Sequence, residues 1–312
     1  MRYVVTGGAG FIGSHLATRL VDEGHDVVIL DNFSTGRKKN IASLCKGDRV
    51  QCVEGSVTDF QLLVNLFEGA DGVFHQAAVT SVQESIRCPF ATHKVNATGT
   101  LNVLQAACDL GVGSVVFASS AAVYGNNQVL PLSEWVTPIP LSPYAVSKLT
   151  AEHYAKVFAD LYGIKTVALR YFNVYGPRQD PNSEYAAVIP RFITRALRGE
   201  PLRIYGDGEQ TRDFVYVQDV VEANIRAMES EVTGVFNVAT GQQTSLNRLA
   251  AIVGTATGTD VKTVYAPPRA GEVRYSWAYT ARAREELGFV SQYTIQSGIE
   301  ATVEWFRERS RI

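Results

Sequence analysis

The sequence predicts an α/β protein with a doubly wound parallel sheet, followed by a smaller mixed α/β part. Residues Arg2–Thr6 form a β-branched run that leads through a glycine-rich turn into helical apolar spacing over Ser14–Glu23. Short apolar runs then alternate with helical patterns as far as Arg170, which is typical of parallel sheets. After Arg170 the chain becomes rich in turn residues over Phe172–Asn182, a texture typical of binding loops.

Length, composition and charge favour small-molecule ligands. The chain has 312 residues, of which 46% are hydrophobic and 19% are charged, enough for one large domain or two modest ones. Its formal net charge of -2 gives no electrostatic basis for binding nucleic acid, and no basic run predicts a membrane surface. No signal peptide or bilayer-spanning apolar stretch is visible, so we expect a cytoplasmic protein.

The cysteines give no indication of a metal site. Cys45, Cys52, Cys88 and Cys108 lack the close pairing typical of zinc sites and small disulfide frameworks. We therefore expect all four to be reduced packing residues, and we expect no metal.

The glycine-rich turn has the spacing of a dinucleotide site. In Gly7-Gly-Ala-Gly10-Phe-Ile-Gly13, the first glycine permits a sharp turn and the second lets the backbone approach a pyrophosphate. Gly13 allows the helix to pack closely on the strand.

An acid follows the second predicted strand, Asp26–Leu30. Asp31 comes roughly 20 residues after the glycines, where a carboxylate holds the adenosine ribose of a dinucleotide. Its charge favours NAD because it would repel a 2′-phosphate, although Arg37 and Lys38 nearby leave a case for NADP. A loop-starting role for Asp31 is the alternative.

Two further strands are predicted at Val50–Val53 and Gly72–Phe74. The segment His75–Ala78 has small residues that would let the backbone approach a cofactor. Asn96 lies in a predicted helix over Phe90–Asp109, and a buried asparagine needs partners. It either ties two strands together or contacts the cofactor.

A candidate catalytic group lies near the middle of the chain. The predicted strand Ser114–Ala118 ends at Ser119-Ser120, and ligand chemistry collects beyond the carboxyl ends of parallel strands. Tyr144 and Lys148 are four residues apart and share one face of a helix that Pro143 helps to begin. We expect the ammonium to lower the pKa of the phenol, which would make Tyr144 a base near neutral pH.

The remaining elements complete the first part and build a second. A strand is predicted at Lys165–Arg170. A helix is predicted at Asp219–Met228, and we expect the Asp219 side chain to cap its N-terminus. Residues 1–174 and 213–240 are assigned to the dinucleotide-binding domain, and residues 175–212 and 241–312 to the substrate-binding domain. The predicted helices are Ile189–Arg198, Asp219–Met228 and Ile295–Arg307, and the predicted strands are Leu202–Tyr205, Arg212–Val217 and Gly234–Ala239.

Taken together, the motifs resemble one enzyme family over essentially the whole chain. Gly7-x-x-Gly10-x-x-Gly13, Ser119-Ser120 with Val123-Tyr-Gly125, Tyr144-x-x-x-Lys148 and Arg170–Pro177 resemble the nucleotide-sugar epimerase group of the extended short-chain dehydrogenase/reductases. They are most similar to those of UDP-glucose and UDP-N-acetylglucosamine 4-epimerases. The resemblance implies a Rossmann fold, bound NAD and a UDP-hexose or UDP-N-acetylhexosamine substrate.

The resemblance also implies a mechanism and an assembly. Tyr144 as phenolate would take the 4-OH proton while C4 gives hydride to NAD, and the 4-keto sugar would turn before the hydride returns. Lys148 would bond the nicotinamide ribose, and Ser120 would hold or relay the proton. A homodimer through helices around Asn96–Leu110 and Tyr144–Leu161 is implied, although these apolar faces could equally be core.

Individual ligand contacts follow from the same resemblance. Asn173, Arg212 and Arg269 would bind the diphosphate, where guanidinium suits phosphate geometry, and Glu272 would meet the uridine ribose. Arg212 beside Asp213 could instead be an ordinary ion pair, and Arg269 a solvated loop residue. The implied cofactor contacts are Gly7, Gly10, Phe11, Ile12, Gly13, Asp31, Asn32, Ser34, Gly36, Ser56, Val57, Gln76, Ala77, Ala78, Asn96, Ser119, Tyr144, Lys148 and Tyr171. The implied substrate contacts are Ser81, Ser120, Ala121, Tyr144, Phe172, Asn173, Ala187, Val188, Tyr205, Arg212, Val215, Arg269, Glu272 and Ser276.

Departures from related enzymes narrow the activity. Ala121 and Ala122 stand where dehydratases carry an Asp-Glu pair, which disfavours dehydration and decarboxylation. A uronic acid 4-epimerase stays possible, although such relatives commonly have threonine at the place of Asn173. A regulator on the same fold would commonly have lost the tyrosine or the lysine.

Three further positions bear on ligand size and cofactor retention. Ser276 matches a gate residue whose small size predicts room for an N-acetyl group, unless Tyr275 or Trp277 fills the space. Ser56 replaces an aspartate that bonds the adenine in relatives, so we expect NAD to be held less tightly in this chain than in them. Tyr279 stands where related enzymes commonly have an aspartate, so the match of Ser276 to the gate position depends on the local alignment with those enzymes.

Overall fold

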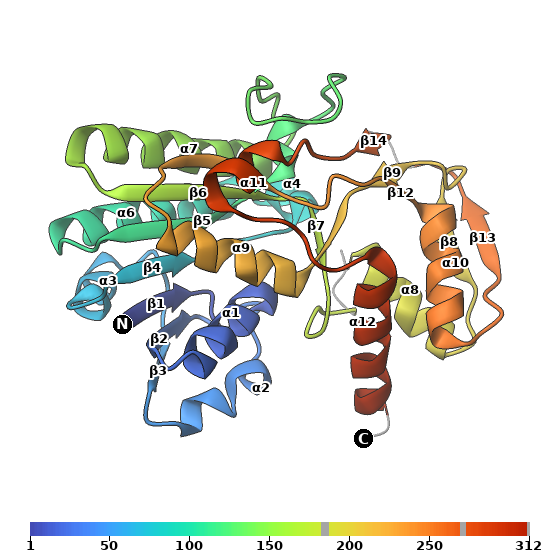
Figure 1. The fold of residues 1–312 in the computed structure, drawn as a ribbon, viewed down its shortest axis with the longest axis horizontal. Helices are drawn as coiled ribbons and strands as arrows, with labels where there is room; N and C mark the ends of the chain where they lie inside the picture. Colours follow the sequence, from blue (N-terminus) through green and yellow to red (C-terminus); the bar gives the residue numbers. More distant parts are fainter. Residues whose placement is uncertain (182–186, 269–272, 311–312) are drawn as a thin grey trace.

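The first core is a seven-stranded parallel sheet, whose strands follow one another downwards from β6 to β3 in Figure 1, in a computed structural model that describes residues 1–181, 187–268 and 273–310. The strand order is β11-β6-β5-β4-β1-β2-β3, and every neighbouring pair is parallel. Their bounds are β1 Arg2–Thr6, β2 Asp26–Asp31, β3 Val50–Glu54, β4 Gly72–His75, β5 Ser114–Ser120, β6 Lys165–Tyr171 and β11 Gly234–Val238. The order reverses between β1 and β4, where such sheets open a ligand crevice. The predicted fold class is confirmed.

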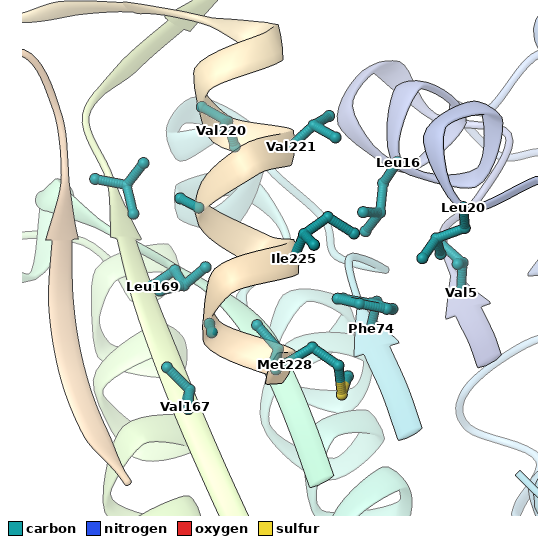
Figure 2. Packing of buried hydrophobic residues seen from close by; sticks show 14 of the residues in the cluster. Val5, Leu16, Leu20, Phe74, Val167, Leu169, Val220, Val221, Ile225 and Met228 are labelled. Atoms are coloured by element: carbon teal, nitrogen blue, oxygen red, sulfur yellow. The ribbon is translucent and has the colours of Figure 1, made fainter. Parts of the chain in front are cut away.

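Helices cover both faces of this sheet. On one face lie α1 (Phe11–Asp22), α9 (Val217–Glu229) and α11 (Ala281–Leu287), and on the other α3 (Phe60–Phe67), α6 (Gly99–Asp109) and α7 (Pro143–Tyr162). Figure 2 shows Leu16 and Leu20 of α1 and Ile225 of α9 converging on Val5 and Phe74 of the sheet. This close packing fixes the carboxyl ends of the strands, where the site lies.

The second part has its own apolar core. In Figure 1 it lies to the right of the sheet, with α8 (Val188–Leu197), α10 (Leu246–Thr257) and α12 (Ile295–Ser310) around the small pair of β8 (Leu202–Tyr205) and β13 (Thr263–Ala266). Residues 217–238 return to the large sheet as α9 and β11. Helix α11 also packs there through Ala283 and Leu287, although the sequence division placed it in the second part.

The remaining elements are short or belong to the second part. They are α2 Lys38–Ile41, α4 Val82–Arg87, α5 Pro89–His93, β7 Asn173–Tyr175, α8 Val188–Leu197, β8 Leu202–Tyr205, β9 Thr211–Arg212, β10 Phe214–Tyr216, β12 Thr244–Ser245, α10 Leu246–Thr257, β13 Thr263–Ala266, β14 Tyr275–Ser276 and α12 Ile295–Ser310. Within the described residues, no helix combines the length and apolar character needed to cross a bilayer.

One helix prediction is confirmed and one needs correction. The helix predicted over Phe90–Asp109 is continuous, although its middle, Lys94–Thr98, is π-helical between α5 and α6. The predicted cap at Asp219 is wrong, because α9 begins at Val217. The Asp219 carboxylate instead accepts hydrogen bonds from Ser291 Oγ (2.7 Å) and the Gln292 amide (2.8 Å), which joins α9 to the segment before α12.

The expectation of four reduced cysteines is also wrong. Cys45 and Cys52 form a disulfide with 6.0 Å between their Cα atoms, which links a 3₁₀ turn at Leu44–Lys46 to β3. The chain folds back between them, so two cysteines separated by seven positions come within bridging distance. Cys88 is exposed and Cys108 is half-buried, and both are free thiols.

Candidate active site

A cavity of about 970 Å³ lies beyond the carboxyl ends of the central strands and reaches the second part of the chain. It brings together most of the residues that the sequence assigned to ligand binding. Those lining it are Gly7, Gly10, Phe11, Ile12, Gly13, Asp31, Asn32, Ser34, Gly36, Ser56, Val57, Gln76, Ala77, Ala78, Ser119, Ser120, Tyr144, Lys148, Tyr171, Phe172, Asn173, Ala187 and Val188.

The glycine turn at one end of the cavity leaves no room for side chains. Gly7 has a φ of +68°, and a Cβ there would lie 2.7 Å from the Ala77 amide nitrogen. A Cβ at Gly13 would lie 2.3 Å from the carbonyl oxygen of Gly7. The turn and the start of α1 therefore pack backbone to backbone, which leaves amide groups at the cavity wall for a pyrophosphate.

Asp31 ends β2 at the wall of the same cavity. Its carboxylate accepts hydrogen bonds from the amides of Ala9 (2.9 Å) and Phe33 (2.8 Å). Burial raises the pKa of this carboxyl, and the amide hydrogen bonds act in the opposite direction. Gly36 closes over it, since a Cβ there would lie 2.5 Å from Asp31 Oδ1. A carboxylate has about four acceptor positions, so Asp31 can still accept from ribose hydroxyls.

Ser120, Tyr144 and Lys148 meet at the middle of the cavity. Ser120 is the last residue of β5, and α7 begins at Pro143, capped by Ser142 Oγ, which accepts from the Ala145 amide (3.2 Å). Helix α7 therefore presents Tyr144 and Lys148 to the end of β5.

The predicted lowering of the Tyr144 pKa is not observed. Burial raises the pKa of this phenol, and a hydrogen bond with Ser120 lowers it by less. Lys148 Nζ donates to the carbonyl oxygen of Ala118 (2.7 Å). Burial lowers the pKa of Lys148 to about 8, while the charge of Glu152 raises it. The protonation states of Tyr144 and Lys148 therefore depend on the charges that surround them in the cavity.

A hydrogen-bond cluster beside the catalytic group includes one residue that sequence reasoning missed. Gln76 Nε2 donates to Tyr171 OH (3.1 Å) and to Asn224 Oδ1 (3.0 Å), and Asn224 Nδ2 donates to Tyr171 OH (2.8 Å). Burial raises the pKa of Tyr171, so its phenol stays protonated. Asn224 is fully buried in α9, and a polar residue within that apolar pattern was the signal available.

Asn96 has a structural role in this arrangement. Its Oδ1 accepts from the Val79 amide (2.8 Å), and its Nδ2 donates to Val79 O (2.9 Å) and Ser147 Oγ (3.1 Å). It ties the loop after β4 to α7 rather than joining two strands. Asn96 does not line the cavity, since its side chain is used within the protein.

Several residues predicted as substrate contacts do not line this cavity. Ser81 caps α4 by accepting from the Glu84 amide (3.1 Å), and Val215 is buried in the first core. Ala121 begins the 3₁₀ turn after β5 and packs on a small apolar cluster. These residues do not line the cavity, and neither do Tyr205, Arg212 and Ser276. Arg269 and Glu272 lie outside the described residues.

Arg212 and Ser276 nevertheless lie side by side. They are register partners on β9 and β14 in a three-stranded sheet of the second part. The carboxylate of Asp213, the suggested ion-pair partner of Arg212, is fully buried and accepts from the amides of Thr240 and Gly241 (both 2.8 Å). Asp213 therefore anchors this segment to the large sheet.

Sequence reasoning did not identify four polar side chains that line the cavity. Arg178, Gln179 and Asp180 line it together with Arg37, and the Arg37 guanidinium pairs with the Asp180 carboxylate. Turn residues had marked this stretch as a binding loop without identifying which side chains face inward. Lys38 pairs with Glu54 (3.0 Å), so both cations suggested for a 2′-phosphate have carboxylate partners.

The cavity combines two functions that the sequence assigned separately. If Tyr144 takes the proton of a substrate hydroxyl, the hydride on the same carbon needs an acceptor in the same cavity. The glycine turn and Asp31 suit a dinucleotide, which can be that acceptor. Fold and site thus define a dinucleotide-dependent α/β enzyme acting at a substrate hydroxyl. In the part of the chain that is described, no cluster of three or more His, Cys, Asp or Glu side chains could hold a metal.

Known proteins narrow this class. The model of the NAD dependent epimerase/dehydratase family matches residues 3–239, so the chain belongs to that family and its cofactor is NAD. It is 41% identical over 314 residues to the UDP-glucose 4-epimerase of Mycolicibacterium smegmatis, with 100% of both chains covered.

Solved structures agree with this family. A UDP-glucose 4-epimerase from Thermotoga maritima with UDP-glucose has a TM-score of 0.94 and 42% identity, covering 99% of this chain and 100% of that one. A UDP-N-acetylglucosamine 4-epimerase from Methanobrevibacter ruminantium M1 in complex with UDP-N-acetylmuramic acid has a TM-score of 0.95 and 40% identity, covering 99% and 98%.

Proposed function

We propose that this protein interconverts UDP-hexoses by reversible epimerisation at C4, acting on UDP-glucose and UDP-galactose and also on their N-acetyl counterparts. The observation that carries this proposal is the meeting of Ser120, Tyr144 and Lys148 in a cavity whose other end suits a dinucleotide. In this proposal the reaction belongs to galactose metabolism in the cytoplasm.

The residues of the chain supply binding and proton transfer. When bound, NAD supplies the hydride acceptor and a positive charge on its nicotinamide ring. A positive charge held in the cavity would lower the pKa of the Tyr144 phenol against the effect of burial, in the same direction as its hydrogen bond with Ser120. A charged Lys148 is expected to favour the phenolate in the same way. Tyr144 then takes the 4-OH proton directly or through Ser120 and returns it after the 4-keto sugar has turned.

Neighbouring side chains argue against other reactions of the family. Ala121 and Ala122 follow Ser120 in a 3₁₀ turn and provide no acid or base for removing water. A UDP-uronic acid 4-epimerase is the second candidate, since the Arg212 cation lies beside Ser276, its register partner on β14. Against it, Asn173 lines the cavity and carries a side-chain amide where such relatives commonly have a threonine hydroxyl. The backbone amide of Asn173 donates to Asp213 O (3.0 Å).

Product analysis tests the proposal. NAD-loaded protein is incubated separately with UDP-galactose, UDP-N-acetylgalactosamine and UDP-glucuronic acid, and the nucleotide sugars are separated. We expect each of the first two to reach a mixture with its C4 epimer, and the uronic acid to remain unchanged. Conversion of the uronic acid alone would establish the second candidate, and turnover of none of the three would refute the proposal.

Ser276 provides a test of sugar size. Ser276 does not line the cavity itself, but it matches the gate position of related epimerases. We therefore expect Ser276→Tyr to reduce kcat/KM for UDP-N-acetylgalactosamine by about 10- to 200-fold, because added bulk would remove room for an N-acetyl group that extends from the cavity towards β14. The value for UDP-galactose should change by less than threefold or so. Ser43→Tyr, on the exposed turn near Cys45, is the matched control and should change neither. Equal losses for both sugars would show that Ser276 does not act as a gate.

An exposed apolar surface supports the proposed homodimer. It is formed by side chains of α4, α5 and α7, including Ile86 (56% exposed), Phe90 (90%) and Leu161 (71%). These helices contact one another, so the exposed side chains lie on adjoining helices, one of which carries Tyr144 and Lys148. Sedimentation equilibrium at micromolar protein should give twice the mass of the chain, and the mass of one chain would exclude this assembly.

A further inference from the structure

Helix α7 carries a third polar side chain in line with Tyr144 and Lys148. Glu152 follows Lys148 by four residues, as Lys148 follows Tyr144, so all three lie on one face of the helix. Glu152 is only 5% exposed, and Lys148 is equally buried. A buried carboxylate is costly unless it is paired, so its partners indicate what it does.

Glu152 joins α7 to two neighbouring strands. Its Oε1 accepts from Ser119 Oγ and from Arg170 Nε (2.9 Å), and its Oε2 accepts from Arg170 Nη2 (2.7 Å). This two-pronged pairing fixes both distance and orientation. The Arg170 guanidinium also packs over the Tyr124 ring, 4.7 Å from its centroid.

The two partners of Glu152 adjoin the cavity-lining residues. Ser119 and Arg170 are register partners on β5 and β6, and the next residues on those strands are Ser120 and Tyr171. Glu152 therefore connects the helix that carries Tyr144 to the strand end that carries Ser120. The separation between the two groups that handle the substrate proton depends on this connection.

Glu152 is also the acid whose charge reaches Lys148. The charge of Lys148 acts on His75 of β4, Arg170 of β6 is paired with Glu152, and Tyr144 and Tyr171 line the same cavity as Lys148. Burial lowers the pKa of His75 to about 3, so this imidazole is neutral at physiological pH. Tyr171 is protonated, and Arg170 carries the charge opposite to that of a carboxylate.

We propose that Glu152 is a positioning residue for the epimerase reaction: its carboxylate keeps the buried Lys148 ammonium charged and holds α7 against the strand that carries Ser120. The predicted effects of Glu152 on the reaction rate rest on the proposed function. Its effect on the charge of Lys148 is independent of the substrate.

The pH dependence of the rate separates this role from a purely structural one. At high pH the rate should fall as Lys148 loses its proton. Removing a negative charge makes that loss easier, so in Glu152→Gln the alkaline limb of kcat should move to lower pH by about one unit. Glu152→Asp retains the charge and should keep the wild-type limb. Asp160→Asn, an exposed acid on α7 that pairs with Lys156 (2.6 Å), is the matched control and should change neither limb nor rate.

A second variant is needed in case Glu152→Gln does not fold. Glu152→Gln leaves Arg170 as an unpaired buried charge, which is strongly destabilising. The double variant Glu152→Gln/Arg170→Gln removes both charges, which act on Lys148 in opposite directions, so its alkaline limb should lie between those of Glu152→Gln and the wild type. A wild-type alkaline limb in folded Glu152→Gln, or a limb in the double variant below that of Glu152→Gln, would overturn the proposal.

A substrate-free measurement keeps this inference distinct from the proposed function. The ultraviolet absorbance of tyrosinate is titrated in NAD-loaded protein, and the Tyr144→Phe curve is subtracted to isolate Tyr144. Glu152→Gln should raise the pKa of Tyr144, because a neutral Lys148 no longer favours the phenolate. An unchanged Tyr144 titration would refute the role of Glu152, whereas inactivity of the wild-type protein towards UDP-sugars would refute only the proposed function.

Discussion

Tyr144→Phe is expected to lower kcat for UDP-galactose by about 100- to 10,000-fold, the usual contribution of a positioned acid or base. The substitution removes one hydroxyl and leaves the ring, so packing on the half-buried α7 face and binding of NAD should be unchanged. The measurements are kcat, the NAD content of the purified protein and its far-ultraviolet circular dichroism.

A second tyrosine on the same helix provides the control. Tyr154 is 38% exposed and lies away from the cavity, so Tyr154→Phe should retain the wild-type rate. A folded, NAD-loaded Tyr144→Phe protein that also works at the wild-type rate would show that another group moves the proton.

Gly13→Ala is expected to abolish tight NAD binding and to destabilise the fold. The new Cβ would lie 2.3 Å from the Gly7 carbonyl oxygen and 2.9 Å from Gly8 Cα, and both are backbone atoms that cannot rotate away. Overpacking of this kind costs about 1–3 kcal/mol, and the movement of the turn displaces the amides that face the pyrophosphate. We expect purified protein with little bound NAD and a lower midpoint of urea unfolding.

The control for this prediction is Gly47→Ala. Gly47 has ordinary extended dihedral angles, and a Cβ there would meet its nearest atom, the Leu44 carbonyl oxygen, at 3.5 Å. NAD content and unfolding midpoint should both stay at wild-type values. If Gly13→Ala also retained full NAD content, the turn would not be the pyrophosphate site.

Local patterns were sufficient to predict much of the fold. Apart from the partly exposed β3, the strands of the sheet are short, mostly buried runs, and the contacts that require Gly13 are made with Gly7 and Gly8, within seven residues of it. Asp31 was found for the same reason, since its partners Ala9 and Phe33 belong to the two loops that flank the site. Sequence spacing predicts a site residue correctly where the position of that residue is determined by the strand or turn that carries it.

Long-range partners were beyond the reach of such patterns. Gln76 meets Asn224 from 148 positions away, and Arg37 meets Asp180 from 143 positions away. The pKa of Tyr144 was predicted from its spacing to Lys148 alone, but burial by surrounding elements raises it. The bridge between Cys45 and Cys52 depends on how the chain turns before β3, which their spacing alone did not reveal.

Isotope retention at C4 tests the central claim most directly. UDP-galactose carrying deuterium at C4 is converted by NAD-loaded protein in ordinary water, and the product UDP-glucose is analysed by mass spectrometry and NMR. Tyr144 and Ser120 move a proton only at oxygen, and Ala121 and Ala122 offer no base for a carbon-bound hydrogen. We therefore predict that the deuterium remains at C4 of the product, whereas its loss to solvent would contradict the account.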